Sequence, residues 1–85
     1  MMGKIEDVAF VPIETRLATR LLELTSSEGM VLATHDQLAI DLGTAREVVS
    51  RKLAQWEKSG FIERARGSLR LVNVRKLENI AALGD

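Results

Sequence analysis

The chain has 85 residues, of which 46% are apolar and 28% charged, so a single small domain with a hydrophobic core is expected. It contains no cysteine, which excludes disulfides, thiolate metal sites and cysteine nucleophiles. The apolar runs are too short for a membrane span, and the doubled Met1-Met2 is typical of an artificial start rather than a signal peptide.

The first third of the chain is expected to be helical and to end in a brief strand. Residues 4–10 look like a short helix, and Pro12 interrupts the pattern before a longer helix over residues 13–26. The apolar residues of this longer helix recur at helical spacing and should face the core: Ile13, Leu17, Leu21 and Leu24. A short apolar run over residues 30–33 then predicts a brief strand.

A short capped helix follows this strand. Thr34 and Gln37 match a capping box, in which each side chain satisfies a backbone N–H group of the first turn. The helix that begins here carries apolar residues at helical spacing and should end at Gly43. It is about two turns long.

A second capping box is predicted directly after the first helix, at Thr44 and Glu47. It would begin a helix over residues 45–59, with Gly60 as its C-terminal stop. The residues predicted to face the core are Val49, Leu53 and Trp56. Two capped helices joined through a single glycine are typical of a tight helix-turn-helix.

The remaining residues predict a β-hairpin and a last helix. Residues 61–66 and 69–73 alternate as strands do, and Gly67-Ser68 should join them as a tight turn. The inward residues are expected to be Ile62, Leu69 and Leu71, with Phe61 or Val72 as a further member. A helix over residues 75–83 should place Leu77, Ile80 and Leu83 on one side. The predicted fold is mainly α with a small β-hairpin wing (α+β), a winged helix-turn-helix.

The formal net charge is zero, but the basic residues are concentrated in one segment. Between residues 44 and 76 there are nine basic and three acidic residues, whereas residues 1–43 have a net charge of −4. Such clustering favours a polyanionic partner, although a solvated charged face fits the charge pattern equally well.

The segment from Thr34 to Leu71 resembles the winged-helix domain of the Crp/Fnr regulators. The residues that carry the resemblance are Arg46, Glu47, Ser50 and Arg51, followed by Leu53, Glu57 and Gly60. It extends over roughly residues 5–83 and implies sequence-specific binding of double-stranded DNA, with the helix over residues 45–59 in the major groove.

The resemblance implies that bases are contacted by Arg46, Glu47, Ser50 and Arg51, at a half-site with a TGA-like core. Arginine can bind guanine O6 and N7, and glutamate can accept from cytosine N4. The predicted phosphate contacts are Thr34, His35, Arg66 and Ser68. Simpler interpretations remain open: Glu47 as a cap only, Arg51 as its surface ion-pair partner, and the wing as a solvated hairpin.

The family normally carries an effector-sensing β-barrel and a long dimerisation helix. Residues 1–10 resemble the tail of that helix, and residues 11–85 would form the DNA-binding domain. We therefore expect a fragment of a longer cytoplasmic regulator, which is a homodimer and has RNA polymerase as a further partner. The chain itself should need no cofactor and bind DNA weakly as a monomer.

Two other classes of function are less consistent with the sequence than DNA binding. An enzyme is not supported, because the sequence contains no nucleophile motif, no phosphate loop and only one histidine, His35. A winged helix used for protein–protein contact is the main alternative, and it would favour a neutral or apolar recognition helix. A different DNA-binding winged-helix family would keep the function and change the site residues.

Overall fold

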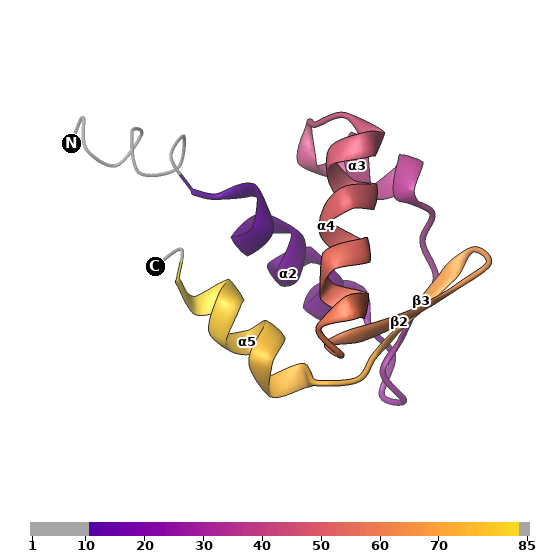
Figure 1. The fold of residues 1–85 in the computed structure, drawn as a ribbon, viewed down its shortest axis with the longest axis vertical. Helices are drawn as coiled ribbons and strands as arrows, with labels where there is room; N and C mark the ends of the chain where they lie inside the picture. Colours follow the sequence, from indigo (N-terminus) through magenta and orange to yellow (C-terminus); the bar gives the residue numbers. More distant parts are fainter. Residues whose placement is uncertain (1–10, 84–85) are drawn as a thin grey trace.

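The computed structural model describes residues 11–83 and confirms a mainly helical winged helix-turn-helix (Figure 1). In chain order the elements are α2 (Ile13–Leu24), β1 (Met30–Val31), α3 (His35–Leu42), α4 (Arg46–Lys58), β2 (Ile62–Ala65), β3 (Ser68–Leu71) and α5 (Val74–Ala82). The short helix predicted over residues 4–10 lies outside the described residues. The helix bounds agree with the predicted ones to within two residues, and the differences lie at helix ends, where helices fray.

The three strands form one antiparallel sheet in which β3 lies between β1 and β2. β2 and β3 pair along their whole length and are the predicted wing hairpin. β1 pairs with the other edge of β3 and is only two residues long, shorter than the strand predicted over residues 30–33. Beyond β1 the chain leaves the sheet, and Leu32 is 82% exposed.

The wing turns one residue earlier than the sequence predicts. Ala65 pairs with Ser68, so the loop consists of Arg66-Gly67, and Ser68 is the first residue of β3. Gly67 has a φ of +74°, a left-handed conformation that glycine adopts without steric cost. The predicted turn at Gly67-Ser68 is therefore wrong by one position, because the strand pairing extends through Ser68.

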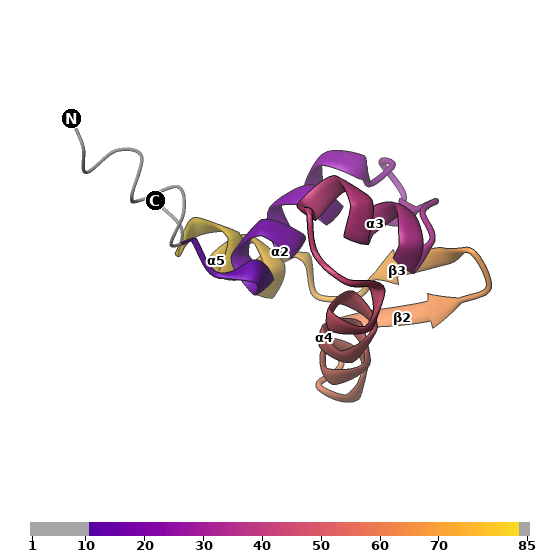
Figure 2. The ribbon, with the colours of Figure 1, turned by 90° about the horizontal axis from the view of Figure 1, so that it is seen from above.

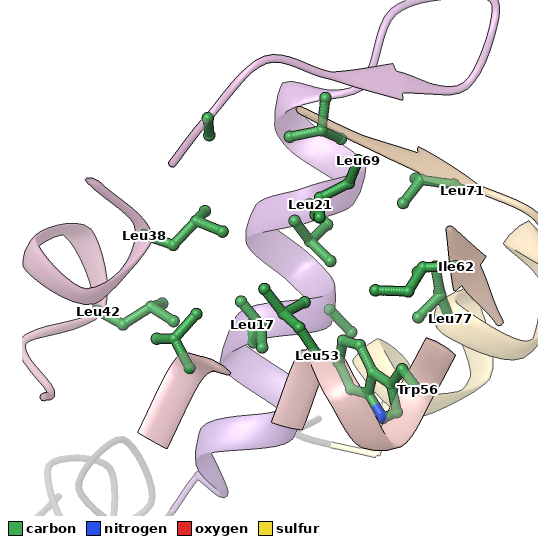
Figure 3. Close-up of a cluster of buried hydrophobic side chains, with 14 of the residues drawn as sticks. Leu17, Leu21, Leu38, Leu42, Leu53, Trp56, Ile62, Leu69, Leu71 and Leu77 are labelled. Carbon is green, nitrogen blue, oxygen red and sulfur yellow. The ribbon is translucent and has the colours of Figure 1, made fainter. Parts of the chain in front are cut away.

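One cluster of buried apolar side chains joins the helices to the sheet (Figure 3). Figure 3 shows Leu17 and Leu21 of α2 at its centre, with Trp56 of α4 at one side. The buried members are Leu17, Ala18, Leu21, Val31, Ala33, Leu38, Ala39, Leu42, Val49, Leu53, Trp56, Ile62, Leu69, Leu71 and Leu77. Every residue predicted to face the core from α4 and from the wing strands is among them, and Phe61 packs against the cluster.

Two apolar residues at helix ends were predicted to face the core and do not. Leu24 is 38% exposed and Leu83 is 78% exposed. Leu24 is the last residue of α2, and Leu83 lies just beyond the end of α5. Apolar spacing predicts which face of a helix is buried, but it does not say how far along that face the neighbouring elements reach.

Different elements form the two ends of the domain (Figure 2). α2 and α5 contact each other and lie side by side at one end of the domain. α4 contacts α3 and β2, and the β2–β3 hairpin extends at the end away from α5. The fold thus places the start of α3, the start of α4 and the wing together, away from the α2–α5 pair.

Candidate nucleic-acid interface

The first helix of the motif begins at a complete capping box. Thr34 Oγ1 accepts a hydrogen bond from the Gln37 N–H at 3.1 Å, and Gln37 Oε1 accepts one from the Thr34 N–H at 2.9 Å. Each side chain satisfies a backbone donor near the start of the helix that has no intrahelical partner. The predicted start of α3 is therefore confirmed.

The turn between α3 and α4 closes through Gly43, which has a φ of +68°. The Gly43 N–H donates to the Ile40 carbonyl at 3.2 Å, and the Thr44 N–H donates to the Ala39 carbonyl at 3.0 Å. This pair of bonds satisfies carbonyls in the last turn of α3 and is typical of a helix that ends at a left-handed glycine. The chain can then enter α4 within three residues.

The second predicted capping box is not formed. α4 begins at Arg46 with Ala45 as its N-cap, and within residues 11–83 no side chain caps it. Thr44 belongs instead to the turn that ends α3, because its N–H is bonded to Ala39. Glu47 therefore does not cap α4. It lies in the first turn of this helix, where the helix dipole favours negative charge.

The four residues predicted to contact bases all lie in the first two turns of α4. Arg46, Glu47 and Arg51 are exposed, and Ser50 is half-buried. A hollow of about 400 Å³ is lined by Ala45, Arg46, Glu47 and Ser50. Arg51 lies outside this lining, four residues after Glu47 and on the same side of the helix. The opposite face of α4 is the one buried in the core.

The charged side chains at this surface are loosely engaged. Arg46 Nε lies 3.6 Å from Asp36 Oδ1, and the two side chains are 67% and 68% exposed. Exposed ion pairs of this kind contribute little to stability, so a DNA group can displace the carboxylate. Within residues 11–83, neither Glu47 nor Arg51 makes an ion pair, so they do not neutralise each other.

His35 and Ser50 join the two helices of the motif. His35 Nδ1 lies 2.7 Å from Ser50 Oγ, which is hydrogen-bond distance. Burial lowers the pKa of His35, and the nearby positive charges of Arg64 and Arg46 lower it further. Asp36 opposes this shift with a smaller effect. A hydrogen bond thus joins His35, which is predicted to contact a phosphate, to Ser50, which is predicted to contact a base.

A second hollow, of about 240 Å³, lies between the start of α3 and the wing. Its lining consists of Ala33, Thr34, His35, Arg46, Ala65, Gly67 and Ser68. Three of the four residues predicted to contact phosphates therefore border one depression beside an arginine. The fourth, Arg66, is exposed in the loop at the tip of the wing.

A contact between Glu57 and Arg64 fixes the wing to the end of α4, and it was not predicted from the sequence. Glu57 Oε2 accepts from the Arg64 backbone N–H at 3.1 Å, and Oε1 accepts from Arg64 Nε at 2.9 Å. The backbone hydrogen bond and then the side-chain bond lower the pKa of Glu57. The only signal in the sequence was the Leu53, Glu57 and Gly60 pattern, which gives no partner for the glutamate.

The pairing of the basic residues shows which of them are engaged within the domain. Four of the nine between residues 44 and 76 lie near carboxylates: Arg46, Lys52, Arg64 and Arg70. In the part of the chain that the structure describes, Arg51 and Arg66 make no ion pair. The same part contains no helix of the length and apolarity needed to cross a membrane and no cluster of three His, Asp or Glu suited to a metal ion.

Comparison with known proteins identifies the family of the chain. Residues 15–80 match the Crp-like helix-turn-helix domain family. Over 86 aligned residues the chain is 33% identical to the transcriptional regulator SdrP of Thermus thermophilus, covering 92% of this chain and 43% of that protein.

Two solved structures show the same fold. A Crp/Fnr-family transcriptional regulator from Eubacterium rectale has a TM-score of 0.84 and 30% identity, covering 95% of this chain and 38% of its own. A Crp/Fnr-family regulator from Thermus thermophilus has a TM-score of 0.81 and 30% identity, covering 95% of this chain and 46% of its own. The chain therefore spans less than half the length of the relatives it matches.

Proposed function

The chain belongs to the family of Crp-like helix-turn-helix domains, and we propose that it recognises its DNA sequence by placing α4 in the major groove. Its relatives are Crp/Fnr transcription regulators of bacteria. The chain is accordingly a DNA-binding domain for transcriptional regulation, from a family of regulators rather than enzymes.

The surface at the start of α4 gives this proposal its main support. Arg46, Glu47 and Ser50 share one hollow, and Arg51 lies beside it, so hydrogen-bond donors and acceptors face solvent together. We assign base contacts to these four residues, at a half-site with a TGA-like core. Arginine suits the O6 and N7 acceptors of guanine, and the Glu47 carboxylate suits the N4 donor of cytosine.

We assign phosphate contacts to Thr34, His35, Arg66 and Ser68. The hollow between α3 and the wing supports this assignment, because three of the four border it and a helix N-terminus favours the binding of an anion. Arg66 at the wing tip would contact the backbone farther along. These contacts fix the register of the domain on the duplex and carry no sequence information themselves.

Selection from a randomised duplex library at low salt tests the proposal, followed by titration of the selected duplex against salt. We expect a TGA-like motif and a steep fall of affinity with salt, by a slope of about −0.9 in log–log terms for each phosphate neutralised. Arg66→Ala should reduce that slope by about 1 and leave the selected motif unchanged. Salt-sensitive binding without any motif would reject base recognition by α4.

We further propose that the chain is part of a longer cytoplasmic regulator that forms a homodimer. Two domains would then address half-sites about one helical turn, ~34 Å, apart on the duplex. An effector-sensing domain and contact with RNA polymerase belong to the same proposal. A single domain should bind weakly, because it lacks the gain from bivalent engagement.

A protein-interaction module is the second candidate, and one observation favours it. Leu32 and Ile40 are 82% and 79% exposed, and both line a hollow of about 270 Å³ outside the assigned DNA contacts. Exposed apolar residues of this size can mark a protein contact. Failure to select any duplex, even when two copies of the chain are linked, would favour this candidate over DNA recognition.

A further inference from the structure

We propose that His35 is a positioning residue for base recognition: it sets the direction of the Ser50 hydroxyl and so decides which bases Ser50 favours. The inference rests on the proposed function, because it requires α4 to lie in the major groove. The hydrogen bond between His35 and Ser50 would couple a contact to the DNA backbone with a contact to a base. Neither residue provides this coupling alone.

The geometry places the pair between the two hollows of the interface. His35 borders the hollow between α3 and the wing, and Ser50 borders the hollow at the start of α4. The 2.7 Å contact between His35 Nδ1 and Ser50 Oγ joins them. Within residues 11–83, the second ring nitrogen, Nε2, makes no hydrogen bond, so it remains for a ligand in the hollow assigned to phosphate.

A bound phosphate would select one tautomer of His35. Phosphate oxygens accept hydrogen bonds, so Nε2 must carry the proton to contact one. A neutral imidazole has a single N–H, which leaves Nδ1 as an acceptor. The Ser50 O–H then donates to Nδ1, and the Ser50 oxygen offers its lone pairs to the groove. An acceptor at this position favours the exocyclic amines of adenine N6 and cytosine N4.

Protonation of His35 would reverse this arrangement. Both ring nitrogens of an imidazolium are donors, so Ser50 would accept from Nδ1–H and its own O–H would be released. A free hydroxyl donor favours guanine O6 and N7 or thymine O4. The identity of the favoured base thus depends on the protonation state of a residue that does not itself contact a base.

The charged groups around His35 decide which state prevails. Arg46 on α4 and Arg64 on β2 disfavour the imidazolium, and partial burial acts in the same direction. Asp36 on α3 favours the imidazolium, and a phosphate at Nε2 would do the same. Because burial and the two arginines together lower the pKa of His35, the neutral form should prevail near neutral pH, with Ser50 as an acceptor.

The test compares the base preference at the position facing Ser50 at two pH values. That position is identified as the one where Ser50→Ala abolishes discrimination among the four base pairs. With the unsubstituted chain at about pH 8, we expect base pairs that present an amine to Ser50 to be favoured by about 3- to 10-fold. The preference should shrink or reverse as the pH is lowered from there through the pKa of His35, which lies below its ordinary value of 6.5.

Two substitutions of His35 separate positioning from a general effect on binding. His35→Phe removes both ring nitrogens and should abolish the preference at both pH values. His35→Asn retains a hydrogen-bonding group near the position of Nδ1 that does not titrate, so its preference should not change with pH. Circular dichroism checks that both variants are folded.

Two results would overturn the inference, and they are distinguishable. If His35→Phe binds the selected duplex with an unchanged, pH-independent preference facing Ser50, the inference is wrong and the proposed function stands. If the unsubstituted chain discriminates at no base pair, the proposed function fails and the inference fails with it.

Discussion

Glu57, near the end of α4, accepts two hydrogen bonds from Arg64 on β2, one from the backbone N–H and one from the guanidinium. A single carboxylate thereby connects the helix assigned to the bases with the wing assigned to the backbone. The contact lies outside both hollows of the interface, so it can orient the wing without occupying a DNA-contacting surface.

The Glu57–Arg64 contact should make the free energy of unfolding depend on pH in the acid range. The folded state lowers the pKa of Glu57, so its contribution is present above the ordinary value of 4.5 and is lost as pH falls through the folded value. Glu57→Gln should therefore show a smaller loss of unfolding free energy below about pH 4.5 than the unsubstituted chain. Urea denaturation at several pH values measures this.

Glu63→Gln is the matched control for Glu57→Gln. Glu63 lies on the same strand as Arg64 and pairs only loosely with Arg70, at 3.8 Å with both side chains mostly exposed. The Glu63→Gln substitution removes the same negative charge as Glu57→Gln but breaks no hydrogen bond to the protein backbone. Identical pH profiles for Glu57→Gln and the unsubstituted chain would show that the carboxylate does not hold the wing.

Trp56 should be the most costly single truncation on α4. Its side chain is 5% exposed in the core cluster, so Trp56→Ala should lower the unfolding free energy by about 3–5 kcal/mol. Trp56→Phe keeps most of the buried surface and should cost distinctly less. Thermal denaturation measures both, and a melting temperature for Trp56→Ala within about 2 °C of the original would contradict the burial of Trp56.

Gly43 should be required for its backbone conformation rather than for space. A Cβ at this position would meet no atom within 4 Å, but the φ of +68° is strained for a residue with a side chain. Gly43→Ala should therefore lower the unfolding free energy by about 1–2 kcal/mol. Gly43→Asn should cost less, because asparagine tolerates the left-handed region better. Equal stabilities of glycine and alanine would exclude the proposed strain.

Arg51 should contribute to sequence discrimination and not only to attraction. Arg51→Ala should weaken binding to the selected duplex by about 1–3 kcal/mol and relax the preference at one base pair. Arg75→Ala removes the same charge from α5, outside the assigned contacts, and should leave the preference intact. Fluorescence anisotropy with single-substitution duplexes compares the two, and equal losses on all duplexes for Arg51→Ala would reject its assignment to a base.

Local signals in the sequence predicted the helices well. The capping box at Thr34 and Gln37 forms as expected, because both partners lie within one turn. The same spacing at Thr44 and Glu47 gave a wrong cap, because the backbone of Thr44 is used to end the preceding helix. A four-residue pattern cannot show which of two adjacent helices a residue belongs to.

Contacts between elements were the part that the sequence did not predict. The hydrogen bond between Glu57 and Arg64 joins the end of α4 to β2, with no periodic pattern to indicate it. The bond between His35 and Ser50 depends on how α3 crosses α4. Six of the eight predicted site residues line two hollows that share Arg46, and Arg51 and Arg66 lie outside both. The interactions that position these residues became visible only in three dimensions.

Backbone amide NMR with the selected duplex tests most directly whether α4 and the wing form the DNA-binding surface. We expect the largest shift changes at residues 45–51, with further changes at Thr34, His35 and residues 66–68. Residues on α5 should change little. Changes concentrated at Leu32 and Ile40 instead, with residues 45–51 unaffected, would contradict DNA binding by α4 and locate the binding surface at the hollow that these two residues line.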